Sequence, residues 1–108
     1  MNRQRRILLL APAIALAGRA PAAAAPKVHT VRMAKMVFGP APTGVRIGDI
    51  IEWVNADIFQ HTATARTGAF DVDLKPGAKA RTVLRTAGVV AYYCRYHPGM
   101  TGRVVVAA

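Results

Sequence analysis

Three side chains with soft donor atoms lie close together in the segment "YYCRYHPGM", residues 92–100. Cys94 offers a thiolate, His97 an imidazole and Met100 a thioether, and two residues separate each from the next. Cysteine and histidine also occur in nucleophilic catalytic sites, but no common site of that kind needs a thioether. For a metal site, this combination of soft ligands suits copper better than calcium, magnesium or zinc. The spacing therefore predicts a copper site in one short loop.

A blue-copper site needs a second histidine, because it combines two histidines and one cysteine in a plane with a weak axial methionine. His61 follows the loop "NADIFQ" and opens a strand pattern, whereas His29 lies inside the first strand pattern, away from any turn. We therefore predict His61 as the second histidine and expect His29 at the surface or a sheet edge. Each residue alone has an ordinary structural explanation. Their fixed spacing together argues for a metal site.

Short strand patterns separated by turns run through the chain after residue 27. The patterns are rich in β-branched and aromatic residues and cover 28–33, 44–55 with a break at Gly48-Asp49, 61–65, 80–86, 89–94 and 102–107. Seven or eight short strands in about 80 residues predict an all-β fold, an antiparallel Greek-key β-sandwich or barrel. Ile51, Trp53 and Asn55 alternate onto one face of a strand, which makes Trp53 a core residue.

The first 24 residues have the three-part layout of a secretory signal peptide: a basic start, an apolar run and a stretch of small residues. The apolar run, about twelve residues, is shorter than the roughly 20 that a membrane-spanning helix needs. Cleavage after Ala24 would leave residues 25–108 as one copper-binding domain that does not span a membrane and is periplasmic or otherwise exported. Arg5-Arg6 partly matches a twin-arginine signal, so the route, Sec or twin-arginine, stays open. Retention of the segment as an anchor is the alternative to cleavage.

Residues 25–108 contain eleven basic and five acidic residues, a net charge near +6. The basic residues are scattered singly, which together with export argues against a nucleic-acid partner. Scattered positive charge is expected to steer the domain toward an acidic protein partner or an anionic membrane surface. The single cysteine cannot form an internal disulfide, so it is either a buried small hydrophobe or a committed thiolate.

The sequence resembles the cupredoxins, and within them the amicyanin branch, over about residues 28–106. The resemblance is carried by "GDIIEWVN", by a histidine six residues after Asn55, by "AGVVAYYC", and by "CRYHPGM" followed by "GRVVV". The Cys-x-x-His-x-x-Met spacing is the most specific element, because plastocyanins and pseudoazurins place two more residues before the methionine. The resemblance implies one copper per chain, with four ligands: His61, Cys94, His97 and Met100.

Two positions depart from this pattern. Family members commonly have an asparagine after the upstream histidine, where this chain has Thr62. The N–H of Thr62 can still reach the cysteine sulfur, but its shorter side chain need not link the ligand loops. Asn55 and Thr62 are therefore candidate supporting residues behind the ligands. Arg95-Tyr96 stand where amicyanin-type loops often have a proline, so we expect a looser loop and a positive charge that raises the reduction potential.

Four protein ligands leave no open position for a substrate, and His29 alone cannot build a second copper centre. The resemblance therefore implies a blue-copper carrier of single electrons and not an enzyme. His97 and Pro98 stand on a short loop whose end is expected at the domain surface, which makes them the predicted electron port. The positive charge favours redox partners with acidic surfaces. A dehydrogenase donor and a c-type cytochrome acceptor are candidates, although the sequence identifies neither, and a monomer is expected. The alternative is a copper chaperone or storage module on the same fold, although such proteins tend to use methionine and histidine without cysteine. A metal-free immunoglobulin-like adhesion module would leave the ligand spacing unexplained.

Overall fold

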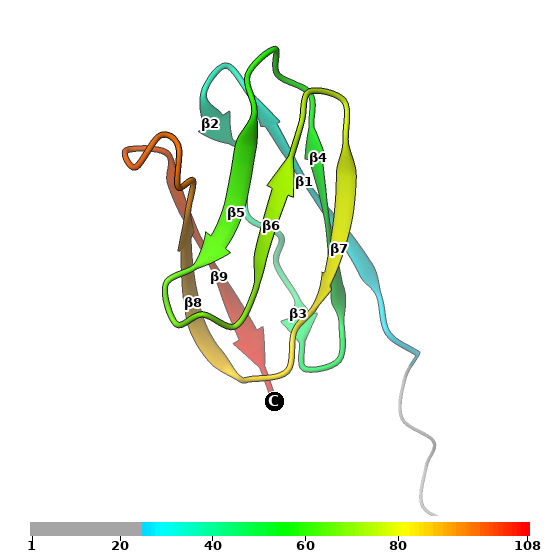
Figure 1. Ribbon diagram of the computed structural model, residues 1–108. Coiled ribbons are helices and arrows are strands. Elements are labelled where there is room, and N and C mark those ends of the chain that lie inside the picture. The colour runs from blue at the N-terminus through cyan, green and yellow to red at the C-terminus, as the bar shows by residue number, and fades with distance from the viewer. Residues whose placement is uncertain (1–24) are drawn as a thin grey trace, which may run out of the picture.

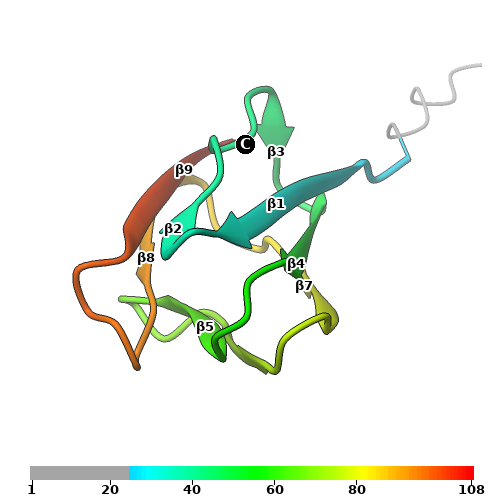
Figure 2. The same cartoon turned by 90° about the horizontal axis from the view of Figure 1, so that it is seen from above.

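The computed structural model describes residues 25–108, so the predicted signal peptide lies outside the described residues. Its secondary structure consists of nine strands: β1 (Val28–Ala34), β2 (Val37–Phe38), β3 (Val45–Arg46), β4 (Ile50–Asn55), β5 (His61–Ala65), β6 (Asp71–Leu74), β7 (Lys79–Val83), β8 (Gly88–Tyr93) and β9 (Thr101–Ala107). They form a four-stranded sheet in the order β2-β1-β4-β7 and a five-stranded sheet in the order β3-β9-β8-β5-β6. Figures 1 and 2 show the two sheets lying against each other as a sandwich.

The predicted all-β sandwich is confirmed, with three differences in detail. There are nine strands, because β2 and β6 were not predicted, whereas β3 and β4 match the two parts of the broken pattern 44–55. Strand β7 ends at Val83, three residues before the predicted end. Two pairings are parallel, β1 with β4 and β3 with β9, within an otherwise antiparallel set. Among residues 25–108, no helix has the length and hydropathy that a membrane crossing requires.

An aromatic cluster fills the space between the sheets. Trp53 from β4 and Tyr92 from β8 are almost fully buried, and their ring centroids lie 5.0 Å apart in an edge-to-face arrangement. Phe38 and Phe70 pack against the same pair of rings. The Trp53 Nε1–H donates to Thr82 Oγ1 across the sheet at 3.1 Å, so the one polar atom of the indole is satisfied. The prediction of Trp53 as a core residue is confirmed.

The close fit of this cluster extends to the start of β9. A Cβ atom added at Gly102 would lie 2.5 Å from the Tyr92 ring, closer than any side-chain atom can approach. Only glycine therefore fits directly opposite Tyr92, its partner in the β8–β9 register. Since Gly102 follows the segment 94–100, this packing fixes where that segment ends.

Asp49 joins three segments at the end of the sandwich where β4 begins. Its carboxylate accepts hydrogen bonds from the backbone N–H of Lys27 and of Arg46, each at 3.0 Å, and from His29 Nε2 at 2.9 Å. His29 is half-buried on β1, at a position that pairs with β4 but lies outside the β1–β2 pairing, so it stands at a sheet edge as predicted. The hydrogen bond from His29, followed by those from the two N–H groups, lowers the pKa of Asp49 to about 2.

We expect Asp49→Asn to lower the free energy of unfolding at pH 7, because two backbone N–H groups and His29 lose a charged acceptor. A carboxyl with a depressed pKa stabilises the fold above its unfolded pKa of about 3.9, and this contribution is lost as the pH falls toward 2. Urea unfolding between pH 7 and pH 2 should therefore show the two proteins converging below about pH 4. A constant difference down to pH 2 would contradict this account of Asp49.

Candidate metal centre

Strand pairing brings the predicted ligands together from two parts of the chain. Strand β5 pairs antiparallel with β8, with Thr64 opposite Tyr93. The next residues along these strands lead to His61 on β5 and to Cys94 just after β8. The segment from Cys94 to Met100, called the ligand segment below, then turns back into β9. Its two ends are joined by the hydrogen bond from Cys94 N to Met100 O at 3.0 Å.

The donor atoms of His61, Cys94 and His97 all lie within 4.8 Å of one another. Cys94 Sγ is 3.8 Å from His61 Nδ1 and 3.6 Å from His97 Nδ1. Metal–sulfur and metal–nitrogen bonds of about 2.3 and 2.0 Å at angles of about 110–120° would separate sulfur from nitrogen by about 3.5–3.8 Å. The observed distances therefore fit one shared metal ion, and the softness of the donors favours copper.

The Cys94 sulfur lies where a thiolate is stabilised although the residue is buried. Burial by itself raises the pKa of the thiol. The backbone N–H of Thr62, 3.3 Å from Sγ, followed by His61, His97 and the N–H of Tyr96, outweighs burial and lowers the pKa of Cys94 to about 6. The ionised form is the one that ligates a metal.

Asp57 orients His61, and the sequence reasoning missed it. His61 Nε2 lies 2.9 Å from Asp57 Oδ2, and the ring is fully buried. An ionised carboxylate can only accept hydrogen bonds, so neutral His61 carries its proton on Nε2 and presents the Nδ1 lone pair to the Cys94 sulfur. The hydrogen bonds from His61 and then from the Met36 N–H hold the pKa of Asp57 at about 2. An acidic residue four positions before a candidate ligand histidine was the available signal.

Asn55, predicted as a supporting residue, organises the loop that leads to His61. Its amide donates to the carbonyl oxygens of Phe59 at 2.8 Å and Leu74 at 2.9 Å, and its Oδ1 accepts the N–H of Asp57 at 2.9 Å. Asn55 is fully buried, and its bond to the Leu74 carbonyl is shielded from water. The loop between β4 and β5 is thereby fixed at both ends.

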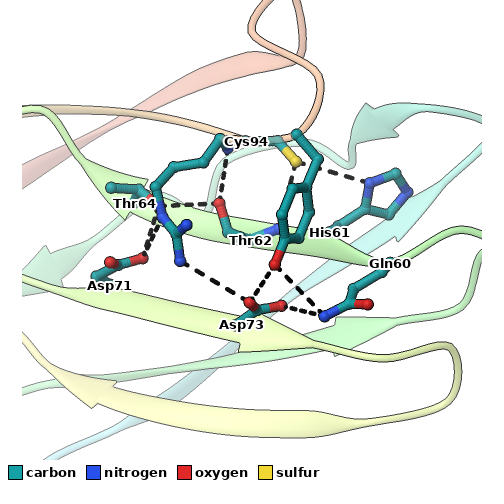
Figure 3. Close-up of polar contacts among 9 residues, drawn as sticks. Gln60, His61, Thr62, Thr64, Asp71, Asp73 and Cys94 are labelled. Atoms are coloured by element: carbon teal, nitrogen blue, oxygen red, sulfur yellow. Dashed lines mark hydrogen bonds and ion pairs between the residues drawn. The ribbon is translucent and has the colours of Figure 1, made fainter.

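Thr62, the other predicted supporting residue, contacts the ligand segment through two groups (Figure 3). Besides the backbone contact to sulfur, its Oγ1 accepts the N–H of Arg95 at 2.8 Å. The expectation that the shorter side chain need not link the two ligand loops is therefore corrected. A threonine hydroxyl reaches the Arg95 N–H directly because β5 runs beside the segment.

The remaining predicted residues differ in exposure. Met100 is 4% exposed at the end of the ligand segment, while His97 is half-buried and Pro98 is exposed. The Phe59 ring packs edge-to-face against the His97 ring, with the centroids 6.2 Å apart. His97 is thus the histidine nearer to solvent and His61 the enclosed one.

The charge of Arg95 does not stand alone beside the site. Arg95 Nε lies 3.2 Å from Asp71 Oδ1, and its terminal nitrogen lies 3.9 Å from Asp73 Oδ2. Two carboxylates of β6 therefore offset the charge of Arg95. That Arg95 raises the reduction potential stays a prediction.

Comparison with known proteins gives a consistent set of relatives, although no protein-family model matches the chain. The amicyanin of Paracoccus denitrificans is 28% identical over 82 residues, and that of Paracoccus versutus is 27% identical over 82 residues. Both alignments cover 70% of this chain, which spans only 63% and 62% of the lengths of these relatives.

Solved structures agree with the sequence relatives. A reduced-state structure of an amicyanin variant has a TM-score of 0.65 at 27% identity, covering 73% of this chain and 81% of that one. A purple cupredoxin from Nitrosopumilus maritimus has a TM-score of 0.65 at 22% identity, covering 73% and 99%. The chain therefore has the cupredoxin fold. Within that fold it is amicyanin-like, since amicyanins match it in both sequence and structure.

We expect Asp57→Asn to weaken copper binding about 10- to 100-fold, because the charged acceptor that orients His61 is lost. Competition titration with a copper chelator measures the change. Asp49→Asn is the matched control, since it removes a carboxylate that also binds a histidine at 2.9 Å, but at the other end of β4. Equal affinities for the two variants would contradict the assigned role of Asp57.

Proposed function

We propose that this protein carries single electrons between redox partners by means of one copper ion bound at this site. The observation that carries the proposal is the cluster of one cysteine and two histidines, two of them fully buried, with donor atoms within 4.8 Å of one another. The amicyanin-like fold supports it. A bound copper ion would supply the Cu(II)/Cu(I) couple.

The proposed ligands are His61, Cys94, His97 and Met100. His61 and Cys94 are fully buried and Met100 is 4% exposed, so three of the four ligands are closed to solvent. A site whose positions are filled by protein side chains leaves no place for a substrate, which is why we propose a carrier and not an enzyme. The same enclosure weighs against a copper chaperone or storage module, which must release its ion readily.

The chain's contribution to electron transfer is a fixed geometry. Asp57 holds His61, the Thr62 N–H holds the Cys94 sulfur, and the bond from Met100 N to His97 O at 2.8 Å closes the ligand segment. Ligands held from independent directions move little when the charge at the site changes. A site that rearranges little exchanges an electron with a low barrier.

His97 is the proposed electron port, with Pro98 beside it. It is the one half-exposed residue of the cysteine–histidine cluster, and Phe59 next to it is 48% exposed. A partner that docks on this surface would come within contact distance of a ligand ring.

The distribution of charge supports a partner with an acidic surface. Within residues 25–108, only Arg81 and Arg95 of the eleven basic side chains lie within ion-pair distance of a side-chain carboxylate. Each of the five acidic residues already has a partner. The pairs are Asp49 with His29, Glu52 with Arg81, Asp57 with His61, Asp71 with Arg95 and Asp73 with Tyr96. The electrostatic potential at the surface of residues 25–108 is therefore mainly positive. We propose an exported or periplasmic carrier acting between a donor such as a dehydrogenase and an acceptor such as a c-type cytochrome.

Copper-loaded protein should contain one copper per chain and show the intense visible absorption of a copper–thiolate bond. We expect Cys94→Ser to abolish this band, because the hydroxyl of serine does not replace the thiolate. Met100→Ala should retain copper and the band but shift the reduction potential, since the axial ligand tunes the potential. Metal analysis, visible spectroscopy and voltammetry test both variants, and a band that survives in Cys94→Ser would refute the ligand assignment.

The rate of electron transfer to an acidic c-type cytochrome should fall as salt shortens the Debye length from about 30 Å to about 8 Å. Lys35→Glu, in the β1–β2 turn at the metal-site end, should slow the reaction at low salt more than Arg85→Glu, which lies beyond β7 at the opposite end. Stopped-flow kinetics measures both effects. A faster low-salt reaction with a basic cytochrome would overturn the steering account.

A further inference from the structure

The segment between Cys94 and His97 has side-chain anchors in place of the rigid proline of amicyanin-type loops. Only Arg95 and Tyr96 lie between these two proposed ligands. Both side chains reach β6, the edge strand beside β5, where they contact Asp71 and Asp73. Figure 3 shows these two aspartates. Residues two apart on a strand share one face, so the two carboxylates point to the same side.

Each residue of the segment has its own contact on β6. Arg95 Nε lies 3.2 Å from Asp71 Oδ1, and the Tyr96 hydroxyl donates to Asp73 Oδ2. Gln60, the residue just before His61, donates to the other oxygen of Asp73 at 2.8 Å. One carboxylate therefore contacts the residue preceding each of the two proposed histidine ligands.

A chain of hydroxyl groups connects Asp71 to the backbone of Arg95, the residue just after Cys94. Thr64 Oγ1 donates to Asp71 Oδ1 at 2.8 Å and lies 2.9 Å from Thr62 Oγ1, which in turn accepts the Arg95 N–H. Thr62 and Thr64 face Asp73 and Asp71 across the β5–β6 register. This explains why Thr62 and Thr64 are buried on the outward face of β5.

We propose that Asp71 and Asp73 are positioning residues for the copper ligands, acting through Arg95 and Tyr96. We call these four residues the β6 anchor. The proposal rests on the proposed function and replaces the expectation that loss of the proline loosens the loop. Arg95, Asp71 and Asp73 have side chains 37–49% exposed, and exposed ion pairs add little to overall stability. The effect of the β6 anchor is therefore on the position of the ligand segment and not on the stability of the fold.

Hydrogen exchange in the copper-free protein tests the anchor without any metal. We expect Tyr96→Phe and Asp73→Ala each to speed exchange of the His97 and Met100 amides by about threefold or more, with little change in Tm. Amide exchange in the double variant should be no faster than in the faster of the two single variants, because both substitutions remove the same contact between Tyr96 and Asp73. Tyr93→Phe is the matched control, since its ring stacks under Arg66 outside the β6 anchor, and it should leave exchange unchanged.

Copper-loaded protein then tests positioning itself. In Tyr96→Phe and Asp73→Ala, but not in Tyr93→Phe, we expect altered copper EPR parameters and electron self-exchange slower by about threefold or more. Unchanged amide exchange, independent effects of the two substitutions, or unaltered EPR and self-exchange would each overturn the proposal. Failure of the unsubstituted protein to bind copper would instead refute the proposed function, and the amide measurement would still decide whether the anchor holds the segment.

Discussion

The antiparallel pairing of β5 with β8 is the constraint on which the rest of the site depends. It places Thr64 opposite Tyr93, and beyond that pair the Thr62 N–H reaches the Cys94 sulfur at 3.3 Å. A slip of one residue would turn every side chain of β5 to the other face and remove His61 from the site. The neighbouring β8–β9 register is held from inside by Tyr92, which packs against Trp53 and leaves room only for glycine at position 102.

Within this pair of sheets, carboxylate side chains hold the strands and the ligand residues in position. Asp49 ties the strand starts together at one end of the sandwich, and Asp57 orients His61 at the other. Asp71 and Asp73 hold the residues between two ligands. Because the acidic side chains of residues 25–108 are turned to these internal contacts, the surface charge left over is mainly positive. The acidic residues thus determine both the geometry of the site and the positive electrostatic potential of the surface around it.

The sequence predicted the features that depend on local pattern. Alternation placed Trp53 and Asn55 inward, and the spacing of Cys94, His97 and Met100 indicated a metal site before any geometry was known. Strand β6 escaped prediction because aspartate disfavours strands. Its two aspartates are tolerated because they face outward and bind the ligand segment.

Contacts between distant segments escaped prediction for a related reason. The pairing of Arg95 with Asp71 spans 24 residues and exists only once β5 and β6 are side by side. No local pattern encodes such a contact, so no partner was predicted for Arg95. Asp57 is different, because it lies four residues before His61, close enough for the sequence to have suggested a partner for the histidine.

The central claim is that the chain holds the copper ligands in place before copper binds. Crystal structures of the copper-free, Cu(II) and Cu(I) forms at one pH test it most directly. We predict that the distances from Cys94 Sγ to His97 Nδ1 and to His61 Nδ1, 3.6 and 3.8 Å here, differ among the three forms by less than about 0.5 Å. A ligand side chain that swings into place only in the presence of copper, or a copper ion bound elsewhere, would contradict the account.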